Sequence, residues 1–477
     1  MSTVTDERSP AGLLARLMVR KPLPRTEDSG FQRVLGALDL TSLGIGAIIG
    51  TGIFVITGTA AAKYAGPGII LSFLFAGLAC AFAALAYAEV ASMIPASGSA
   101  YTYAYTAFGE FIAWVIGWVL VLEYVVATAA VAIGWSGYFV KILHNIGLEL
   151  PAMWVNAPGT VPGALINIPA ILIALAVTTV LVRGIRESVN TNTIFVFVKV
   201  AVLLLFIAIT LGHVNPGNWD PFLPNGFGGV MTGAATIFFA FIGFDAVSNA
   251  AEETKNPQRD LPIGILVSLF VCTAFYVAVG AIFTGIIPQS LYPQLMDNAA
   301  PLAFALEYVG KGWAAALLSI GAVAGITSVL VVMLMGMPRI FFAMGRDGLM
   351  PKVFTKVHPR FGTPHVTTIV TGVAVAILAG LTPISSVAEL ANIGTLFAFI
   401  CVAIGAWVLR YTRPEWKRGF RVPFIPVVAI GTFLSCGYLI ISLPHITIQR
   451  FLIWLAIGIA VYFAYGIRHS VLGNAQK

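Results

Sequence analysis

The chain consists of long apolar stretches separated by short polar segments. A helix that crosses a bilayer needs ~20 consecutive apolar residues, and most of these stretches reach that length. We predict twelve spans, at residues 36–63, 67–94, 108–142, 165–183, 190–211, 229–253, 261–286, 312–345, 364–381, 387–409, 424–443 and 449–468. The pattern predicts an all-α polytopic membrane protein with 12 transmembrane helices. An even number of spans places both termini on the same side of the membrane.

Glycines interrupt two of the predicted spans near their middle. One interruption lies at residues 44–54 of the first span, and the other lies at residues 241–245 of the sixth. Inside a bilayer, unwound backbone exposes N–H and C=O groups that are costly unless something bonds them. The two interruptions therefore predict a site that supplies polar partners. Breaks at corresponding places in two halves of a chain are typical of transporters built from inverted repeats.

This correspondence divides the chain into two five-helix repeats and the segments around them. We predict a cytoplasmic tail at 1–34, a first repeat at 35–211, an extracellular connection at 212–228, a second repeat at 229–409, two further spans at 410–468 and a cytoplasmic tail at 469–477. The two halves show no evident direct sequence match, so the repeat prediction depends on the matching positions of the breaks.

Composition and charge agree with a membrane protein. Hydrophobic residues make up 58% of the chain and charged residues only 10%, which excludes a soluble fold. Most of the 27 Lys and Arg lie in the N-terminal tail and in the segments 339–360 and 410–421, so these are predicted to be cytoplasmic. Anionic lipid headgroups account for the net charge of +7 without a nucleic-acid partner. The four cysteines lie within spans without metal-ligand spacing, and we predict no metal and no cofactor.

The glycine-rich stretch of the first span predicts a site for a carboxylate. Its central residues are Ile48, Ile49, Gly50, Thr51 and Gly52. A helix that restarts near the last of these glycines presents free N–H groups and the positive end of its dipole to the unwound stretch, and the threonine adds a hydroxyl. Close helix packing through small residues is the alternative explanation of the same pattern.

The break in the sixth span predicts the complementary half of the site. The carbonyls around Ala240 and Ile242 are acceptors suited to an ammonium group, and Asp245 lies near the bilayer centre, where a carboxylate needs a partner or a function. Together the two breaks predict a receptor for the zwitterion of an L-amino acid. Phe239 is a candidate lid over the substrate, and Val329 of the eighth span is a candidate lining residue. Ordinary helix packing is the alternative explanation for both residues.

Two further ionisable residues lie deep within predicted spans. Lys199 lies in the middle of the fifth span and Glu123 about halfway through the third. Burial penalises the charged form of an amine, so Lys199 is a candidate for proton coupling; a permanently charged strut that bonds carbonyls of the first span is the alternative. Glu123 is a candidate pocket acid that neutralises a basic substrate side chain or joins a proton path, and a structural partner for another helix is the alternative.

Four motifs resemble those of the amino acid-polyamine-organocation superfamily and, within it, of bacterial relatives of the cationic amino acid transporters. They are GAIIGTGIF at 46–54, IGFD at 242–245, EETKNPQRDLP at 252–262 and PRIFFAMGRDGLMP at 338–351. The resemblance covers the chain from Leu38 onward. It implies the leucine-transporter fold, with a 5+5 inverted repeat and unwound spans 1 and 6, and a lysine in place of a sodium ion at the position that Lys199 matches.

The resemblance and the residues together predict a secondary active transporter and not an enzyme. We expect it to import L-amino acids, small and neutral such as alanine or cationic such as arginine, across a bacterial plasma membrane by alternating access coupled to protons. An exchanger without net proton coupling and a passive channel are the alternatives. The expected partners are the amino acid, protons and membrane lipids. Whether a small accessory subunit or a lipid binds the outer helices is left open by the sequence.

Overall fold

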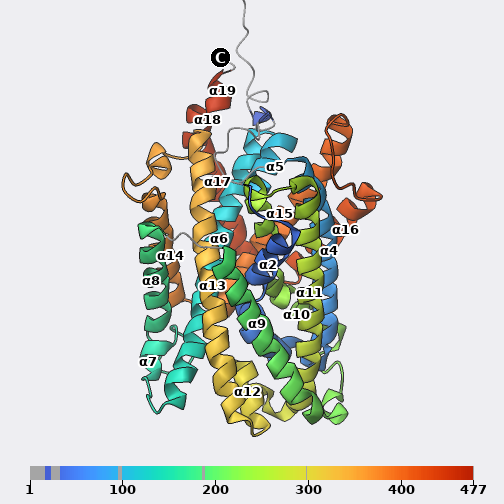
Figure 1. The fold of residues 1–477 in the computed structure, drawn as a ribbon, viewed down its shortest axis with the longest axis vertical. Helices are drawn as coiled ribbons and strands as arrows, with labels where there is room; N and C mark the ends of the chain where they lie inside the picture. The colour runs from blue at the N-terminus through green and yellow to red at the C-terminus, as the bar shows by residue number, and fades with distance from the viewer. Residues whose placement is uncertain (1–16, 23–32, 95–98, 185–188, 297, 476–477) are drawn as a thin grey trace, which may run out of the picture.

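The computed structural model describes residues 17–22, 33–94, 99–184, 189–296 and 298–475. Most of the predicted N-terminal tail, 1–34, and residues 476–477 of the predicted C-terminal tail lie outside the described residues. Long helices run side by side along the vertical axis of the molecule (Figure 1). Among the described residues, β-structure is limited to the isolated bridges Leu35–Thr254 and Val155–Asn167. The all-α prediction is therefore confirmed for these residues.

Helical segments cover the predicted spans in the predicted order. In chain order the main helices are α2 (Ala37–Ile48), α4 (Ile69–Met93), α5 (Ser99–Ala107), α6 (Glu110–Asn145), α7 (Ala152–Val155), α8 (Ile168–Arg183), α9 (Val189–Thr210), α10 (Gly226–Ile237), α11 (Pro257–Ile286), α12 (Pro301–Tyr308), α13 (Gly312–Arg346), α14 (His365–Leu381), α15 (Ile384–Thr412), α16 (Ile425–Ile441), α17 (His445–Val461), α18 (Ile467–His469) and α19 (Val471–Ala475). Short helical turns join several of them.

The described residues include eight helical stretches that are long and apolar enough to cross a membrane. Four shorter apolar helices, α2, α8, α14 and α16, accompany them. Large apolar side chains point outward on the peripheral helices, such as Phe197 at 74% exposure on α9 and Phe270 at 75% on α11. Water disfavours such a surface, whereas lipid tails accommodate it. The chain is a multi-pass membrane protein.

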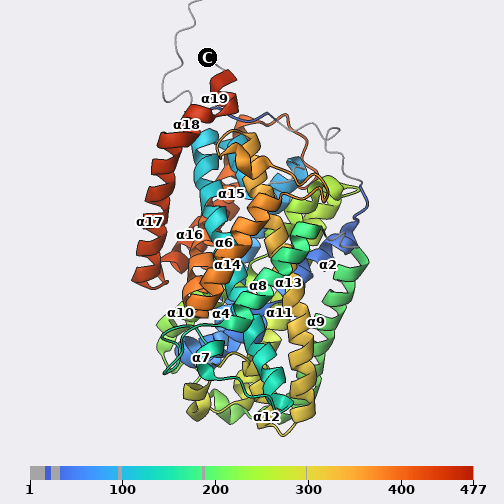
Figure 2. The ribbon, with the colours of Figure 1, turned by 90° about the vertical axis from the view of Figure 1, so that its left-hand side faces the viewer.

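Two groups of helices pack within the bundle. One contains α2, α4, α10 and α11, and the other contains α6, α8, α13 and α14. Helix α15 contacts members of both groups. In Figure 2, α17 and α9 lie at opposite outer edges of the molecule. The two groups meet where α2 contacts α13, close to the predicted breaks.

The two described terminal segments lie at the same end of the bundle. Lys21 Nζ forms an ion pair with Asp347, with an N–O distance of 2.6 Å, and the Asp347 carbonyl accepts a hydrogen bond from the Val471 backbone N–H at 3.0 Å. Helices α18 and α19 lie at this end, whereas α7 and α12 lie at the opposite end (Figure 1). This arrangement agrees with an even number of membrane crossings.

Candidate substrate site

The first predicted break lies between α2 and the next helical turn. Helix α2 ends at Ile48, and Ile49 takes an extended conformation with φ −73° and ψ 101°. The chain resumes as a π-helical turn at Gly52–Ile56, which continues into the helix Thr57–Ala60. The restart near Gly52 agrees with the sequence prediction, but the interruption is shorter than the predicted 44–54, because Gly44 and Gly46 lie within α2 and Ile53 lies in the resumed helical turn. The glycine stretch also serves packing, because a Cβ on Gly44 would lie 2.4 Å from Ser268 Oγ on α11.

The second break follows α10. A 3₁₀ turn, Phe238–Phe241, leads to Ile242, whose ψ of 130° ends the helical path. Gly243 has φ +124°, a conformation that side chains other than glycine rarely adopt, and a Cβ there would lie 2.9 Å from the backbone C and O of Ala47. A second 3₁₀ segment, Phe244–Glu253, then carries Asp245 in its first turn. Glycine at this position therefore permits both the turn and its close approach to α2.

The two breaks contact each other directly. A Cβ on Gly52 would lie 2.3 Å from Ala240 Cα, so only glycine allows the two backbones to come this close. The hydroxyl of Tyr276, on α11, lies 2.9 Å from the Ile48 carbonyl oxygen and 2.6 Å from the Ala240 carbonyl oxygen. A hydroxyl donates one proton, so it satisfies one of these two carbonyls at a time. Tyr276 therefore joins the unwound backbones of both spans.

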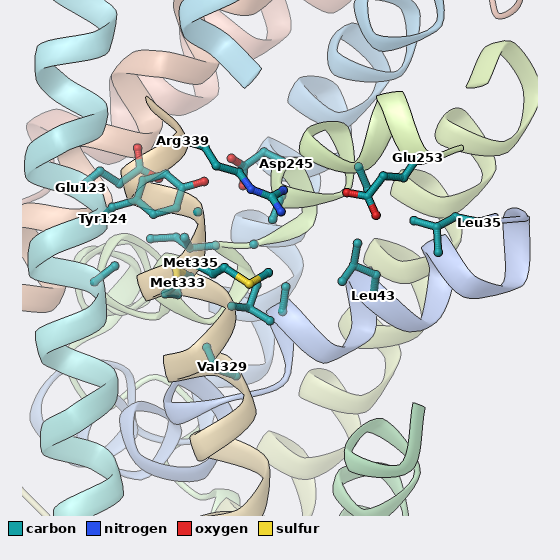
Figure 3. Close-up of a pocket in the computed structure, with 18 of the residues that line it drawn as sticks. Leu35, Leu43, Glu123, Tyr124, Asp245, Glu253, Val329, Met333, Met335 and Arg339 are labelled. Atoms are coloured by element: carbon teal, nitrogen blue, oxygen red, sulfur yellow. The ribbon is translucent and has the colours of Figure 1, made fainter. Parts of the chain in front are cut away.

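A pocket lies between α2, α6, α13 and the segment that contains the second break (Figure 3). Four of the predicted site residues line it: Glu123, Ile242, Asp245 and Val329. Its other lining residues include Leu35, Asp39, Leu43, Ala47, Tyr124, Gly243, Glu253, Met333, Met335 and Arg339. In Figure 3, Arg339 reaches into the pocket from α13 on the side where Asp245 and Glu253 also point inward.

Acidic side chains outnumber basic side chains in the lining of this pocket. Four carboxylates, those of Asp39, Glu123, Asp245 and Glu253, line it with one guanidinium, that of Arg339. Glu123 is buried, and its Oε2 atom has no hydrogen-bond partner among the described residues. A buried polar atom without a partner is costly. The pocket therefore favours a positively charged group or a proton.

Lys199 lies outside the pocket, behind the first break. Its side chain is fully buried, and Nζ donates a hydrogen bond of 2.6 Å to the carbonyl of Gly46, two residues before the end of α2. The aliphatic part of the side chain packs on α13, where a Cβ on Gly325 would lie 2.6 Å from Lys199 Cγ. The amine therefore lies between α2, α9 and α13 and bonds the backbone next to the break.

The remaining predicted residues lie around the breaks and do not line the pocket. Thr51 Oγ1 lies 3.4 Å from the Val131 carbonyl on α6, and Gly50 packs against Val329. Ile49 and Phe239 are buried in the apolar interior. The structure thus brings the predicted residues of spans one and six together, but it separates the predicted lid, Phe239, from the pocket surface.

Two residues of this site were not singled out by the sequence. Tyr276 is one tyrosine within an apolar span, and no pattern distinguishes it from a packing residue. The charge pattern predicts Arg339 to be cytoplasmic with the segment 339–360, whereas the structure places it on α13 with its side chain lining the pocket. A signal for Arg339 existed, because it lies within the predicted eighth span and not beyond it.

Comparison with protein families identifies the chain. The family model of the amino acid permeases matches residues 35–462. The chain belongs to the amino acid permease family. This confirms the resemblance to the amino acid-polyamine-organocation superfamily that the four motifs indicated, and it shows that the protein is a transporter and not an enzyme.

Transporters from a bacterium and a plant are similar to most of the chain. The branched-chain amino acid permease BcaP of Bacillus subtilis (strain 168) is 51% identical over 449 residues, which are 94% of this chain and 96% of the relative. The methylthioribose transporter of the same organism is 49% identical over 465 residues, 97% of this chain and 100% of the relative. The vacuolar cationic amino acid transporter 4 of Arabidopsis thaliana is 38% identical over 80% of this chain and 64% of the relative.

Proposed function

We propose that this permease is a secondary active transporter that imports L-amino acids across the bacterial cell membrane by alternating access. The observation that carries the proposal is the contact of two interrupted spans whose carbonyls share the hydroxyl of Tyr276. The proposal includes twelve spans, both termini in the cytoplasm, and two inverted five-helix repeats at 35–211 and 229–409. Breaks in spans one and six, at corresponding places in the two repeats, support this organisation.

The substrate zwitterion lies in the pocket beside the contact of the two breaks, because the close approach of Gly52 to Ala240 leaves no room between them. Its carboxylate faces the positive end of the helix that restarts at Gly52, and its ammonium meets the carbonyl of Ile242, a lining residue of the pocket. Tyr276 supports this arrangement, because its single proton leaves one of the two carbonyls at the breaks with capacity for a further donor. The excess of carboxylates in the adjoining pocket favours the ammonium end of the substrate.

The substrate side chain occupies an apolar part of the pocket. Ile242, Val329 and Met333 supply aliphatic and thioether surface, which suits small and branched neutral side chains better than charged ones. The similarity to BcaP supports branched-chain amino acids alongside alanine. Glu123 supports cationic amino acids as a second class of substrate, because its unpartnered Oε2 can neutralise the side chain of arginine.

Transport is coupled to protons through Lys199. The Lys199 amine bonds the Gly46 carbonyl beside the break, where a positive charge stabilises the end of α2. Protonation of Lys199 favours the arrangement that holds substrate, and proton loss releases the first span. The group α2, α4, α10 and α11 then rocks against α6, α8, α13 and α14, in agreement with the packing of the two groups.

Uptake into proteoliposomes tests the substrate assignment. Labelled leucine, alanine, arginine and methylthioribose are supplied separately, and leucine uptake is challenged with leucine methyl ester and with 2-ketoisocaproate. A zwitterion site predicts saturable uptake of at least one amino acid and no competition from the two analogues, because each lacks one of the charged groups. Uptake of methylthioribose with no uptake of any amino acid would overturn the proposal.

A further inference from the structure

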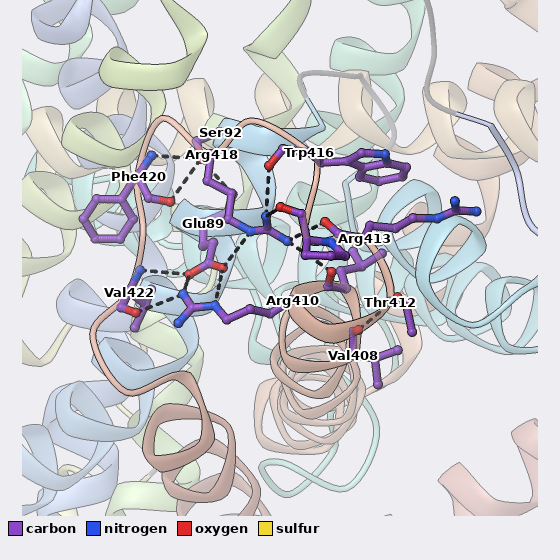
Figure 4. Close-up of polar contacts among 12 residues, drawn as sticks. Glu89, Ser92, Val408, Arg410, Thr412, Arg413, Trp416, Arg418, Phe420 and Val422 are labelled. Carbon is purple, nitrogen blue, oxygen red and sulfur yellow. Dashed lines mark hydrogen bonds and ion pairs between the residues drawn. The ribbon is translucent and has the colours of Figure 1, made fainter.

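The connection between α15 and α16 bends around the largely covered side chain of Arg418. The last two residues of α15 and the connection that follows, residues 411–424, are called the 411–424 loop below. The Arg418 guanidinium donates hydrogen bonds to the carbonyls of Trp416 at 2.9 Å, Arg413 at 3.0 Å and Leu409 at 3.1 Å, and its side chain is 9% exposed. Figure 4 shows these bonds converging on one side chain. Arg418 therefore fixes the shape of the loop.

A buried glutamate fastens the loop to α4. Glu89 Oε1 accepts a hydrogen bond from Arg410 Nε at 3.1 Å and lies 3.5 Å from Arg418 Nε, while Oε2 accepts from the Val422 N–H at 2.8 Å (Figure 4). The N–H of Phe420 donates to Ser92 Oγ at 3.2 Å, one turn further along α4. The loop is thus held to the end of α4 by both an ion pair and backbone hydrogen bonds.

The outer surface of the loop retains positive charge after these bonds are formed. Arg413, Lys417 and Arg421 are exposed, and the single acid beside them, Glu415, lies 3.9 Å from Arg413. Burial is the main cause that lowers the pKa of Arg418 from its ordinary value, the neighbouring Arg410 and Arg421 lower it further, and Glu89 opposes them. Cations thus exceed anions in and around the loop, so a further anion would be stabilised there.

Exposed aromatic side chains flank this charge. Tyr411 is 70% exposed and Phe424 is 80% exposed, and the ring of Trp416 lies 5.6 Å from the Arg413 guanidinium. Aromatic rings and cations together are typical of the headgroup region of a bilayer. The loop directly joins two apolar helices, and one of them, α16, exposes Leu434 at 62% toward the surroundings. Both features place the loop at the membrane surface.

We propose that the 411–424 loop docks on anionic phospholipid headgroups through Arg413, Lys417 and Arg421, and that Glu89 transmits this anchoring to α4. Clusters of cations directly beside a membrane helix attract anionic headgroups. The loop also touches α11, because a Cβ on Gly419 would lie 2.3 Å from Gln258 Cβ. It therefore contacts two helices of the group that moves in the proposed transport cycle. The effect on transport rests on that proposed function, whereas the docking does not.

Thermal unfolding of the detergent-purified permease tests the docking without reference to transport. The probes are phosphatidylglycerol and, as the zwitterionic control, phosphatidylcholine. The charge-neutral variant carries R413Q, K417Q and R421Q, and the matched control carries K352Q, K356Q and R360Q, three exposed cations of another loop. Phosphatidylglycerol is expected to raise the melting temperature of the wild type and of the matched control by about 2 °C or more, but not that of the charge-neutral variant.

Two outcomes of this experiment would overturn the docking. In the first, the charge-neutral variant keeps the full phosphatidylglycerol shift. In the second, the matched control loses the shift to the same extent, which would assign the effect to total charge and not to this loop. A variant that does not purify is replaced by the three single substitutions, whose losses of the shift are expected to add.

Uptake in vesicles tests the transmission through Glu89. The vesicles contain phosphatidylethanolamine with either phosphatidylglycerol or phosphatidylcholine. Wild-type uptake is expected to be several-fold faster with phosphatidylglycerol, whereas Glu89→Gln, which keeps the exposed cations, is expected to lose this dependence and Glu89→Asp to regain part of it. A Glu89→Gln protein that responds to phosphatidylglycerol like the wild type would overturn the transmission. If the proposed function itself were wrong, the wild type would show no uptake in either vesicle while the melting-temperature shift remained.

Discussion

Replacement of Gly243 by alanine tests whether the close contact of the two interrupted spans forms the substrate site. The alanine must adopt φ +124°, which costs ~1–3 kcal/mol for a side chain other than glycine. Its Cβ must also enter a space 2.9 Å from the Ala47 backbone, and overpacking of this kind costs ~1–3 kcal/mol. The conformation that holds both breaks together is therefore penalised by at least ~2 kcal/mol, and substrate affinity falls at least roughly 30-fold.

Equilibrium binding of a labelled amino acid to the purified protein measures this loss. The label is whichever of leucine, alanine and arginine the wild type binds best. Gly310→Ala is the matched control, because Gly310 has φ +75° but open space around its Cβ position. This control should lose stability through strain alone and keep its affinity. A Gly243→Ala protein that binds within threefold of the wild type would refute the argument that this contact forms the site.

Three further substitutions separate the parts of the site. Tyr276→Phe removes the hydroxyl between the two breaks; a net loss of ~1 kcal/mol should weaken binding about fivefold in the same assay, and unchanged affinity would exclude the bridging role. Gly52→Ala forces a Cβ to 2.3 Å from Ala240 Cα and should abolish binding, whereas measurable saturable binding would show that the two backbones separate without cost. Glu123→Gln should lower arginine uptake at least about tenfold and leave leucine uptake within a few-fold, because loss of a charged hydrogen bond costs ~1.5–3 kcal/mol; equal losses for both substrates would assign Glu123 to the proton path.

The spans and their breaks were predictable because they depend on local sequence. Apolar length alone locates a membrane helix, and the observed helices follow the predicted spans. The positions of the two breaks were also local, because Gly50 and Gly243 lie at them, although Gly44 and Gly46 of the same stretch continue as helix in α2. The glycine pattern alone does not distinguish a glycine that allows helix packing from one that allows the two breaks to meet. Gly44 allows α2 to pack on Ser268, while Gly52 allows the contact of the breaks.

The contacts that join the breaks were not predictable, because they are made across long separations in the chain. Tyr276 lies 228 residues from Ile48, whose carbonyl it contacts, and its span contains other aromatic residues with no such role. Arg339 lies inside the predicted eighth span, which indicated an inward position, but also at the start of the basic segment 339–360, which indicated a loop. The depth of Lys199 indicated that it needs a partner, and carbonyls of the first span were one alternative, but only the fold identifies the Gly46 carbonyl among them.

Accumulation of labelled leucine and alanine in proteoliposomes, with an inward proton gradient and with the gradient collapsed, tests the central claim most directly. Wild-type protein should concentrate at least one of the two above equilibrium only while the gradient is present, and Lys199→Met should not concentrate either. Wild-type uptake that ignores the gradient and requires internal amino acid would indicate an exchanger. A Lys199→Met protein that accumulates substrate like the wild type would leave Lys199 as a structural bond to the first span and would contradict the proposed coupling.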